Sequence, residues 1–153
     1  MTTLLKKLNY KVQNTIFIIN HPLEFNQEMT EMKKFVLIKT EVKDTVDIDF
    51  ILVFVKTREE IDHYFANIAN ALNEDCIVWF SYPKGTSKKY KVDINRDHGW
   101  EILGKNGFET VRAVAIDNDW SALRFRKTTH IKTLTRNKKI ALSEEGKSRT
   151  QTK

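Results

Sequence analysis

Basic, hydroxyl and aromatic side chains that could bind an anion gather in one loop, residues 84–96. The loop follows an apolar run that ends at Pro83, and it holds five lysine or arginine residues against one aspartate. Ammonium and guanidinium groups attract phosphates and carboxylates. A helix is expected to begin near Asp97, so its dipole would add to this attraction. The loop predicts a site for a phosphate, a nucleotide or a nucleic-acid backbone, although a lysine-rich loop that simply faces solvent has the same pattern.

Three turns are expected to carry this site: residues 20–22, 82–96 and 117–121. Lysine and arginine would hold the anion, hydroxyl groups would donate hydrogen bonds, and two tryptophans would frame the walls. Aromatic rings between the basic residues could also stack on a base. The predicted ligand-binding residues are His21, Tyr82, Lys84, Thr86, Ser87, Lys88, Lys89, Arg96, Trp100, Asp117 and Trp120. This prediction requires the turn at 20–22 and the loop at 84–96 to meet at one edge of a sheet.

Motifs for catalysis are weak in this sequence. Ser81 and Lys84 have the Ser-x-x-Lys spacing of acyl-transfer enzymes, but at a strand end residues i and i+3 point to opposite faces. The four histidines are scattered, and His21 and His98 could reach the same sheet edge as Asp117 to form a metal or acid–base site. Their spacing matches no metal-ligand motif. We therefore expect no metal, no cofactor and no catalytic residue, and the sequence leans towards a protein that is not an enzyme.

Charge is distributed unevenly along the 153 residues. Residues 127–153 hold eight lysine and arginine residues and two acidic ones, whereas residues 1–126 hold 18 of each sign. The terminal segment lacks aromatic residues and cannot bury much apolar area, so we expect one α/β domain at 1–126 and a basic, partly disordered tail at 127–153. The tail and the 84–96 loop together could bind nucleic acid through its phosphates. A solubilising extension is the simpler alternative.

Targeting features favour the cytoplasm. No stretch stays apolar for the roughly 18 residues that a membrane span requires. The first residues lack the apolar run and the cleavage site of a secretory signal. The single cysteine, Cys76, cannot form an internal disulfide and fits a small buried hydrophobic residue. We expect no membrane partner, and the sequence does not specify an oligomeric state.

Apolar periodicity predicts helices that alternate with strands. Expected strands are 15–19, 35–38, 50–55, 77–82, 110–116 and 122–126, and expected helices are 4–8, 23–32, 57–73 and 97–105. The third strand is apolar at every position, as in a parallel sheet that is buried on both faces. Thr57 and Glu60 form a capping box at the start of the third helix, and Ile61, Phe65, Ile68 and Leu72 form its apolar stripe.

These elements predict the fold class α/β, a three-layer sandwich with a mostly parallel sheet. Right-handed crossovers favour the strand order 2-1-3-4-6-5. The short connection at 117–121 makes the last two strands an antiparallel hairpin at the C-terminal end of the domain.

Two stretches carry a resemblance to known proteins. One runs from Asp49 through the third strand and a helix to Cys76-Ile-Val-Trp-Phe-Ser-Tyr-Pro, and the other is the hairpin around Asp117-Asn-Asp-Trp-Ser-Ala-Leu-Arg-Phe. With this order of elements, the chain resembles a small class I methyltransferase fold, which is Rossmann-like. The hairpin pattern and Tyr82-Pro-Lys also resemble a small bacterial family of unknown function over most of residues 1–126, and that resemblance implies no activity.

The methyltransferase resemblance implies an adenosylmethionine site after the first strand. Glycines in that turn would let backbone amides approach the ligand, but no glycine occurs before Gly85. We therefore expect the usual pocket to be absent and the protein to be a non-catalytic domain that binds an anionic ligand or a macromolecular partner at the carboxyl ends of the strands. The alternatives are nucleic-acid binding through the tail and the 84–96 loop, and a degenerate adenosylmethionine-dependent methyltransferase-like enzyme.

Overall fold

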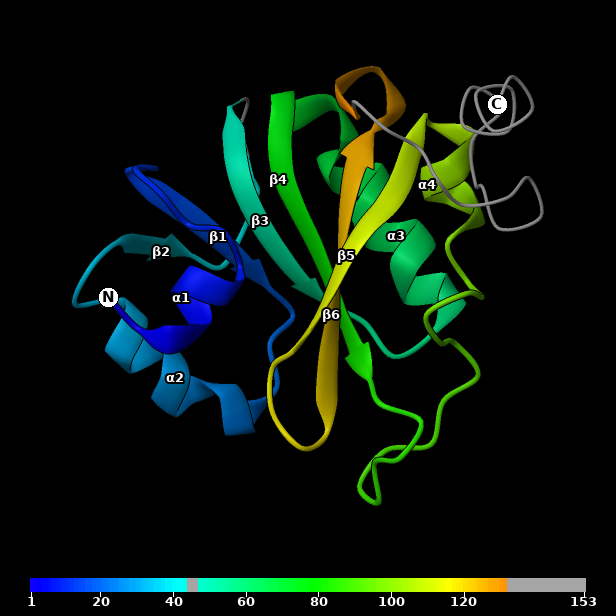
Figure 1. Cartoon of the computed structure of the whole chain (residues 1–153), viewed down its shortest axis with the longest axis horizontal. Coiled ribbons are helices and arrows are strands. Elements are labelled where there is room, and N and C mark those ends of the chain that lie inside the picture. The colour runs from blue at the N-terminus through cyan, green and yellow to red at the C-terminus, as the bar shows by residue number, and fades with distance from the viewer. Residues whose placement is uncertain (44–46, 132–153) are drawn as a thin grey trace.

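Six strands form one mixed sheet in the order β2-β1-β3-β4-β6-β5 (Figure 1). The computed structural model describes residues 1–43 and 47–131. Neighbours from β2 to β4 pair in parallel, whereas β6 is antiparallel to β4 and to β5. The predicted α/β fold, strand order and terminal antiparallel hairpin are confirmed. The strands are β1 (Thr15–Ile19), β2 (Leu37–Lys39), β3 (Ile48–Phe54), β4 (Leu72–Pro83), β5 (Phe108–Ala115) and β6 (Trp120–Lys127).

Helices cover both faces of this sheet (Figure 1). Alternation along β4 sends Val78 and Phe80 to one face and Ile77 and Trp79 to the other, so each face has its own core. On the face of Trp79 lie α1 (Thr3–Lys7), a 3₁₀ turn (Leu23–Phe25) and α2 (Asn26–Met32), and on the face of Phe80 lie α3 (Arg58–Ile68), a 3₁₀ turn (Ala69–Ala71) and α4 (Glu101–Lys105). The result is the expected three-layer sandwich.

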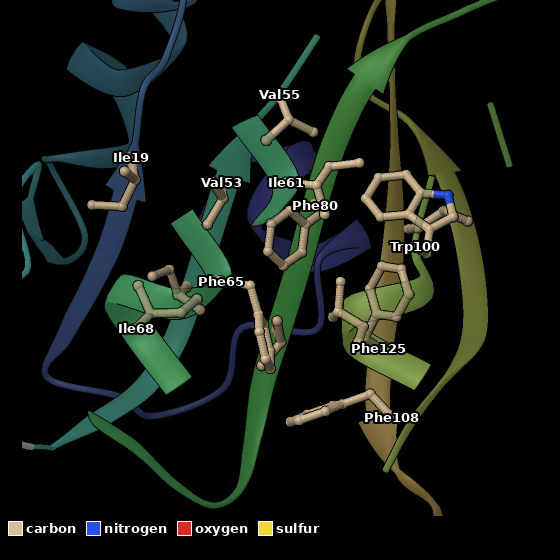
Figure 2. Packing of buried hydrophobic residues seen from close by; sticks show 14 of the residues in the cluster. Ile19, Val53, Val55, Ile61, Phe65, Ile68, Phe80, Trp100, Phe108 and Phe125 are labelled. Atoms are coloured by element: carbon tan, nitrogen blue, oxygen red, sulfur yellow. The ribbon is translucent and has the colours of Figure 1, made fainter. Parts of the chain in front are cut away.

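The predicted start of α3 is correct. The Thr57 hydroxyl accepts from the Glu60 amide at 3.1 Å, and Glu60 Oε1 accepts from the Lys56 amide at 2.6 Å. The helix buries three side chains of its apolar stripe, Ile61, Phe65 and Ile68, against the sheet (Figure 2). Burial of each such side chain stabilises the fold by about 1.5–3 kcal/mol.

Several predicted boundaries differ from the structure, and three of the differences have a local cause. Leu72 is not on the helical stripe, because it pairs with Ile48 as the first residue of β4. β2 begins at Leu37 instead of residue 35, because the amides of Phe35 and Val36 still bond to the Met32 carbonyl. α4 begins at Glu101 instead of residue 97, since Gly99 at φ 111° interrupts any helix there.

Secondary structure continues past residue 126. β6 continues to Lys127, and a 3₁₀ turn (Thr128–His130) follows, in which the Thr128 hydroxyl donates to the Gly107 carbonyl at 3.0 Å. Residues 132–153, which make up most of the predicted basic tail, lie outside the described residues, so the tail stays a prediction. Within the described ranges, no helix combines the length and the apolar character that crossing a membrane demands.

Candidate functional site

The carboxyl ends of β1, β3 and β4 meet at one edge of the sheet, which we call the carboxyl rim. β1 lies between β2 and β3, so the chain runs from β1 to its neighbour β2 on one side and then crosses to β3 on the other side of β1. Ligands of open α/β sheets bind at such a switch point, outside the carboxyl ends of the strands. Ile19 pairs with Val53 there, and the turns that follow these two strands line the switch point.

Asn20 occupies the switch point. Its backbone lies in the left-handed region at φ 61°, a conformation that asparagine tolerates better than most residues other than glycine. Its side-chain amide donates to the Phe54 carbonyl at 2.8 Å and to Glu60 Oε2 at 3.2 Å. Asparagine therefore supplies the tight turn for which the sequence has no glycine, and its side chain bridges the ends of β1 and β3.

The basic loop at 84–96 meets the turn after β1, as the sequence prediction required. The Tyr90 hydroxyl donates to Glu24 Oε2 at 2.6 Å, and the Lys89 ammonium lies 3.2 Å from Glu24 Oε1. The Trp120 indole donates to the same Glu24 oxygen at 3.2 Å. The turn after β1, the loop after β4 and the β5–β6 turn thus join at one carboxylate, and Figure 1 shows the last two side by side.

Glu24 is the acidic centre of this junction. Partial burial alone would raise its pKa, but hydrogen bonds from Tyr90, from Trp120 and from Lys89, together with one from its own backbone, lower the pKa to about 2. Glu24 is therefore ionised at neutral pH. The same contacts raise the pKa of Lys89 above its ordinary value, because its hydrogen bond to Glu24 favours the charged ammonium.

Two of the predicted ligand-binding residues shape the loops instead. Ser87 is buried, donates to Asp119 Oδ1 at 2.8 Å and accepts from the amides of Lys89 and Tyr90, so its hydroxyl holds the loop together. Asp117 Oδ1 accepts from the amides of Asp119 and Trp120 at 2.8 Å, which is an ordinary turn-capping role.

Tyr82 and Trp100 belong to the core on the α3 face. Their rings meet edge to face with centroids 5.9 Å apart, and the Trp100 indole donates to the Asn95 carbonyl at 2.7 Å. Trp120 belongs to the core on the opposite face. The two tryptophans therefore do not frame one pocket, because the sheet separates the two cores to which they belong.

The remaining predicted residues lie on the surface of the rim. Thr86, Lys88 and Arg96 are exposed and Lys84 is half-buried. His21 Nε2 lies 2.9 Å from Asn26 Oδ1. A ligand-binding role for these five residues stays a prediction.

Among the described residues, neither Ser81 nor a cluster of metal-binding side chains is arranged for catalysis. The Ser81 hydroxyl is buried and donates to the Ser121 carbonyl at 3.0 Å. Across residues 1–43 and 47–131, no three His, Cys, Asp or Glu side chains come together as they would to hold a metal ion. The alternative of a metal site that combines His21, His98 and Asp117 therefore has no support.

Sequence reasoning missed Glu24 and Lys56, and it placed Asn20 and Tyr90 in the loops of the site without the contacts that they make. Lys56 lies 5.5 Å from the centre of the Tyr90 ring, as does Lys89 on the same ring. The signal that was available was positional, because Asn20 and Lys56 follow β1 and β3 at the switch point. Nothing in the sequence pairs Glu24 with a tyrosine 66 residues away.

Solved structures share this architecture at low sequence identity. No protein-family model matches the sequence, and no curated protein matches it. N-methyltransferase NodS from Bradyrhizobium japonicum matches with a TM-score of 0.51 and 17% identity over 82% of this chain and 93% of that chain. The chain has a methyltransferase-like Rossmann fold. A NodS complex with S-adenosyl-L-homocysteine gives a TM-score of 0.52 at 15% identity over 82% and 83% of the two chains, and a putative type 11 methyltransferase from Sulfolobus solfataricus gives 0.50 at 10% over 86% and 94%.

The methyltransferase-like Rossmann fold corrects the first functional prediction. A non-catalytic domain that binds an anionic ligand or a partner at the rim is the wrong choice, because the structures that match are methyltransferases. The alternative of a methyltransferase-like enzyme is better supported. The narrower resemblance to a bacterial family of unknown function and the nucleic-acid alternative, which depends on the tail, stay predictions.

Proposed function

We propose that the chain is a methyltransferase-like enzyme that binds adenosylmethionine at the carboxyl rim, over the ends of β1 and β2. The observation that supports this most is the left-handed turn at Asn20, φ 61°, at the switch point of a methyltransferase-like sheet. That turn does what a glycine does in glycine-rich versions of the site, since it lets the chain reverse tightly and brings backbone amides towards a ligand.

An acidic residue near the end of β2 would meet the ribose of an adenosyl ligand. Glu41 is exposed, lies two residues beyond Lys39 at the end of β2 and comes 21 residues after Asn20. In dinucleotide-binding sheets an acidic residue about 20 residues beyond the first turn accepts hydrogen bonds from ribose hydroxyls. The residues present therefore fit a nucleoside with free ribose hydroxyls, and Glu41 would hold it there.

Asn20 would meet the rest of the ligand. Its amide now bonds to Phe54 and Glu60, and it would exchange these bonds for bonds to the ligand. When bound, adenosylmethionine supplies an electrophilic methyl group. The methyl acceptor would approach from the outer side of the rim, where Lys56 and Lys89 flank the Tyr90 ring and present positive charge.

Calorimetric titration with adenosylmethionine and with S-adenosylhomocysteine tests this proposal. Saturable binding is expected in the wild-type protein, and Glu41→Gln should weaken it about tenfold or more, because hydrogen bonds to a charged group are worth about 1.5–3 kcal/mol. Asp62→Asn removes the same charge from the exposed surface of α3 and should bind as the wild type does. A flat trace with both ligands would reject the proposal.

A further inference from the structure

A second cleft lies at the other end of the sheet from the carboxyl rim. It has a volume of about 550 Å³ and lies between the connection at residues 9–14, the start of β3, the first part of β4 and the end of β6. Its volume is in the range of small-molecule sites, about 300–1,000 Å³. It is independent of the adenosylmethionine proposal, because it shares no residue with the rim.

Arg124 is the unusual side chain of this cleft. It is half-buried, and its Nε atom is buried without a hydrogen-bond partner among the described residues. Its neighbour Arg126 is paired, since its Nε and Nη2 donate to the two oxygens of Asp75 at 2.7 and 2.6 Å. Arg124 is therefore the arginine of the cleft lining whose charge is still available to an anion.

The charges around Arg124 point the same way. Arg112 stands directly opposite Arg124 on β5, and Arg126 is two residues further along β6, so three guanidinium groups share one face of the hairpin. Burial, followed by repulsion from Arg126, lowers the pKa of Arg124, although the nearby carboxylate of Asp75 acts in the opposite direction.

Two carboxylates limit what this cleft can accept. Asp75 is paired with Arg126, and Asp49 accepts from the Asn73 amide at 2.6 Å. The charged side chains that line the cleft are Arg124 and Arg126 with Asp49 and Asp75, and the pairing of Arg126 with Asp75 leaves Arg124 and Asp49 for a ligand. One carboxylate would pair with Arg124, whereas a dianion would be repelled by Asp49 and Asp75. Gln13 and Asn14 line the same cleft and offer amide groups to other polar atoms of a ligand.

We propose that this cleft binds a small molecule with a single carboxylate, which the terminal nitrogens of Arg124 hold. Asp49 and the amides of Gln13 and Asn14 select ligands that carry a hydroxyl or an ammonium group beside the carboxylate. Lactate is the simplest probe of this class.

Two-dimensional NMR of backbone amides and arginine Nε–H groups tests the proposal with sodium lactate, phosphate and chloride at equal ionic strength and near neutral pH. Lactate should shift the Arg124 Nε–H signal and the amides of residues 9–14 saturably, and phosphate and chloride should not. Arg124→Gln should weaken lactate binding about tenfold or more. Arg58→Gln removes an exposed arginine of α3 and should leave the affinity unchanged.

Three results would overturn the proposal: no saturable shift with lactate, tighter binding of phosphate than of lactate, or equal lactate affinity in Arg124→Gln and the wild type. Should Arg124→Gln fail to fold, the wild-type titration decides alone, because the Arg124 Nε–H signal reports the site directly. Arg124→Met adds an independent check. It removes the unpaired charge and should unfold at the wild-type temperature or above it, and a clearly lower temperature would mean that Arg124 serves the fold instead of a ligand.

Discussion

The Tyr90 hydroxyl donates a hydrogen bond of 2.6 Å to Glu24 Oε2, which joins the loop after β4 to the turn after β1. The Trp120 indole donates to the same oxygen, and its ring lies edge to face against Tyr90 with centroids 5.1 Å apart. Three segments far apart in sequence are thus held at one carboxylate. The shape of the rim depends on Glu24 staying ionised, which makes its stability sensitive to acid.

Replacing Glu24 with glutamine should change how stability depends on pH. Glu24 has a pKa of about 2 in the folded protein against an ordinary value of 4.5. A lowered pKa contributes stability that is present above the ordinary value and is lost as pH falls from about 4.5 towards 2. Over this range, the unfolding temperature of the wild type, followed by circular dichroism, should fall more steeply than that of Glu24→Gln.

Solvent exposure keeps the Glu24 effect small. At neutral pH, Glu24→Gln should lower the free energy of unfolding by about 1 kcal/mol, because the side chain is partly hydrated and its ion pair with Lys89 is screened. Asp62→Asn serves as the control, and its pH dependence should parallel that of the wild type. Parallel curves for Glu24→Gln and the wild type would mean that Glu24 does not anchor the rim.

Three glycines form a matched series for backbone strain. A Cβ at Gly99, φ 111°, would lie 2.7 Å from Ile94 Cγ2, whereas a Cβ at Gly107, φ 85°, would meet nothing within 4 Å. Gly85 has neither a positive φ nor a close neighbour. In denaturant unfolding, Gly99→Ala should lower the free energy of unfolding by more than about 2 kcal/mol and Gly107→Ala by about 1 kcal/mol. Gly85→Ala should change it by no more than about 0.5 kcal/mol. Equal stability of the Gly99→Ala and Gly85→Ala variants would contradict the structure.

Much of the fold follows from local sequence signals. β3 is buried because every residue from Phe50 to Val55 is apolar, which fits only a central parallel strand. The Thr57 cap fixes the start of α3. The end of α3 was not predictable from the sequence. Leu72 fits the apolar stripe of a helix, but its pairing with Ile48 makes it the first residue of β4. Tertiary pairing overrides local periodicity there.

The site was harder to predict than the fold. Charge pointed to the loop at 84–96, and the structure does place Lys89 at the rim. The contact that anchors the loop comes from Tyr90 and Glu24, and such long-range pairs leave no spacing signal in a single sequence. The turn after β1 has no glycine, and Asn20 adopts the left-handed conformation there.

Cys76 should resist thiol reagents in the folded protein. It is buried, and burial, followed by the nearby carboxylates of Asp49 and Asp75, raises the pKa of its thiol to about 12. Only the thiolate form of cysteine reacts, and almost no thiolate is present at pH values well below that pKa. Labelling with iodoacetamide, followed by mass spectrometry, should give no adduct under native conditions and complete reaction in denaturant. Fast labelling of the native protein would show that β4 opens near Cys76.

Asn20 gives a test of the left-handed turn. Glycine at position 20 keeps the turn and loses only the side-chain bonds to Phe54 and Glu60, at a cost of about 1 kcal/mol. Alanine loses the same bonds and also carries the left-handed strain, about 1–2 kcal/mol more. Asn20→Gly should therefore be more stable than Asn20→Ala in denaturant unfolding, which reverses the usual order of the two residues. Equal stability of the two variants would mean that the turn relaxes to an ordinary conformation.

The same pair separates the turn from the side chain in ligand binding. If the Asn20 amide only blocks the switch point, Asn20→Gly should bind adenosylmethionine more tightly than the wild type, because the crevice is open without breaking the bonds to Phe54 and Glu60. If the amide itself contacts the ligand, as proposed, Asn20→Gly should bind about tenfold more weakly. Calorimetry on the two variants distinguishes these outcomes, and Asn20→Ala should bind more weakly than Asn20→Gly in either case, because its turn is strained.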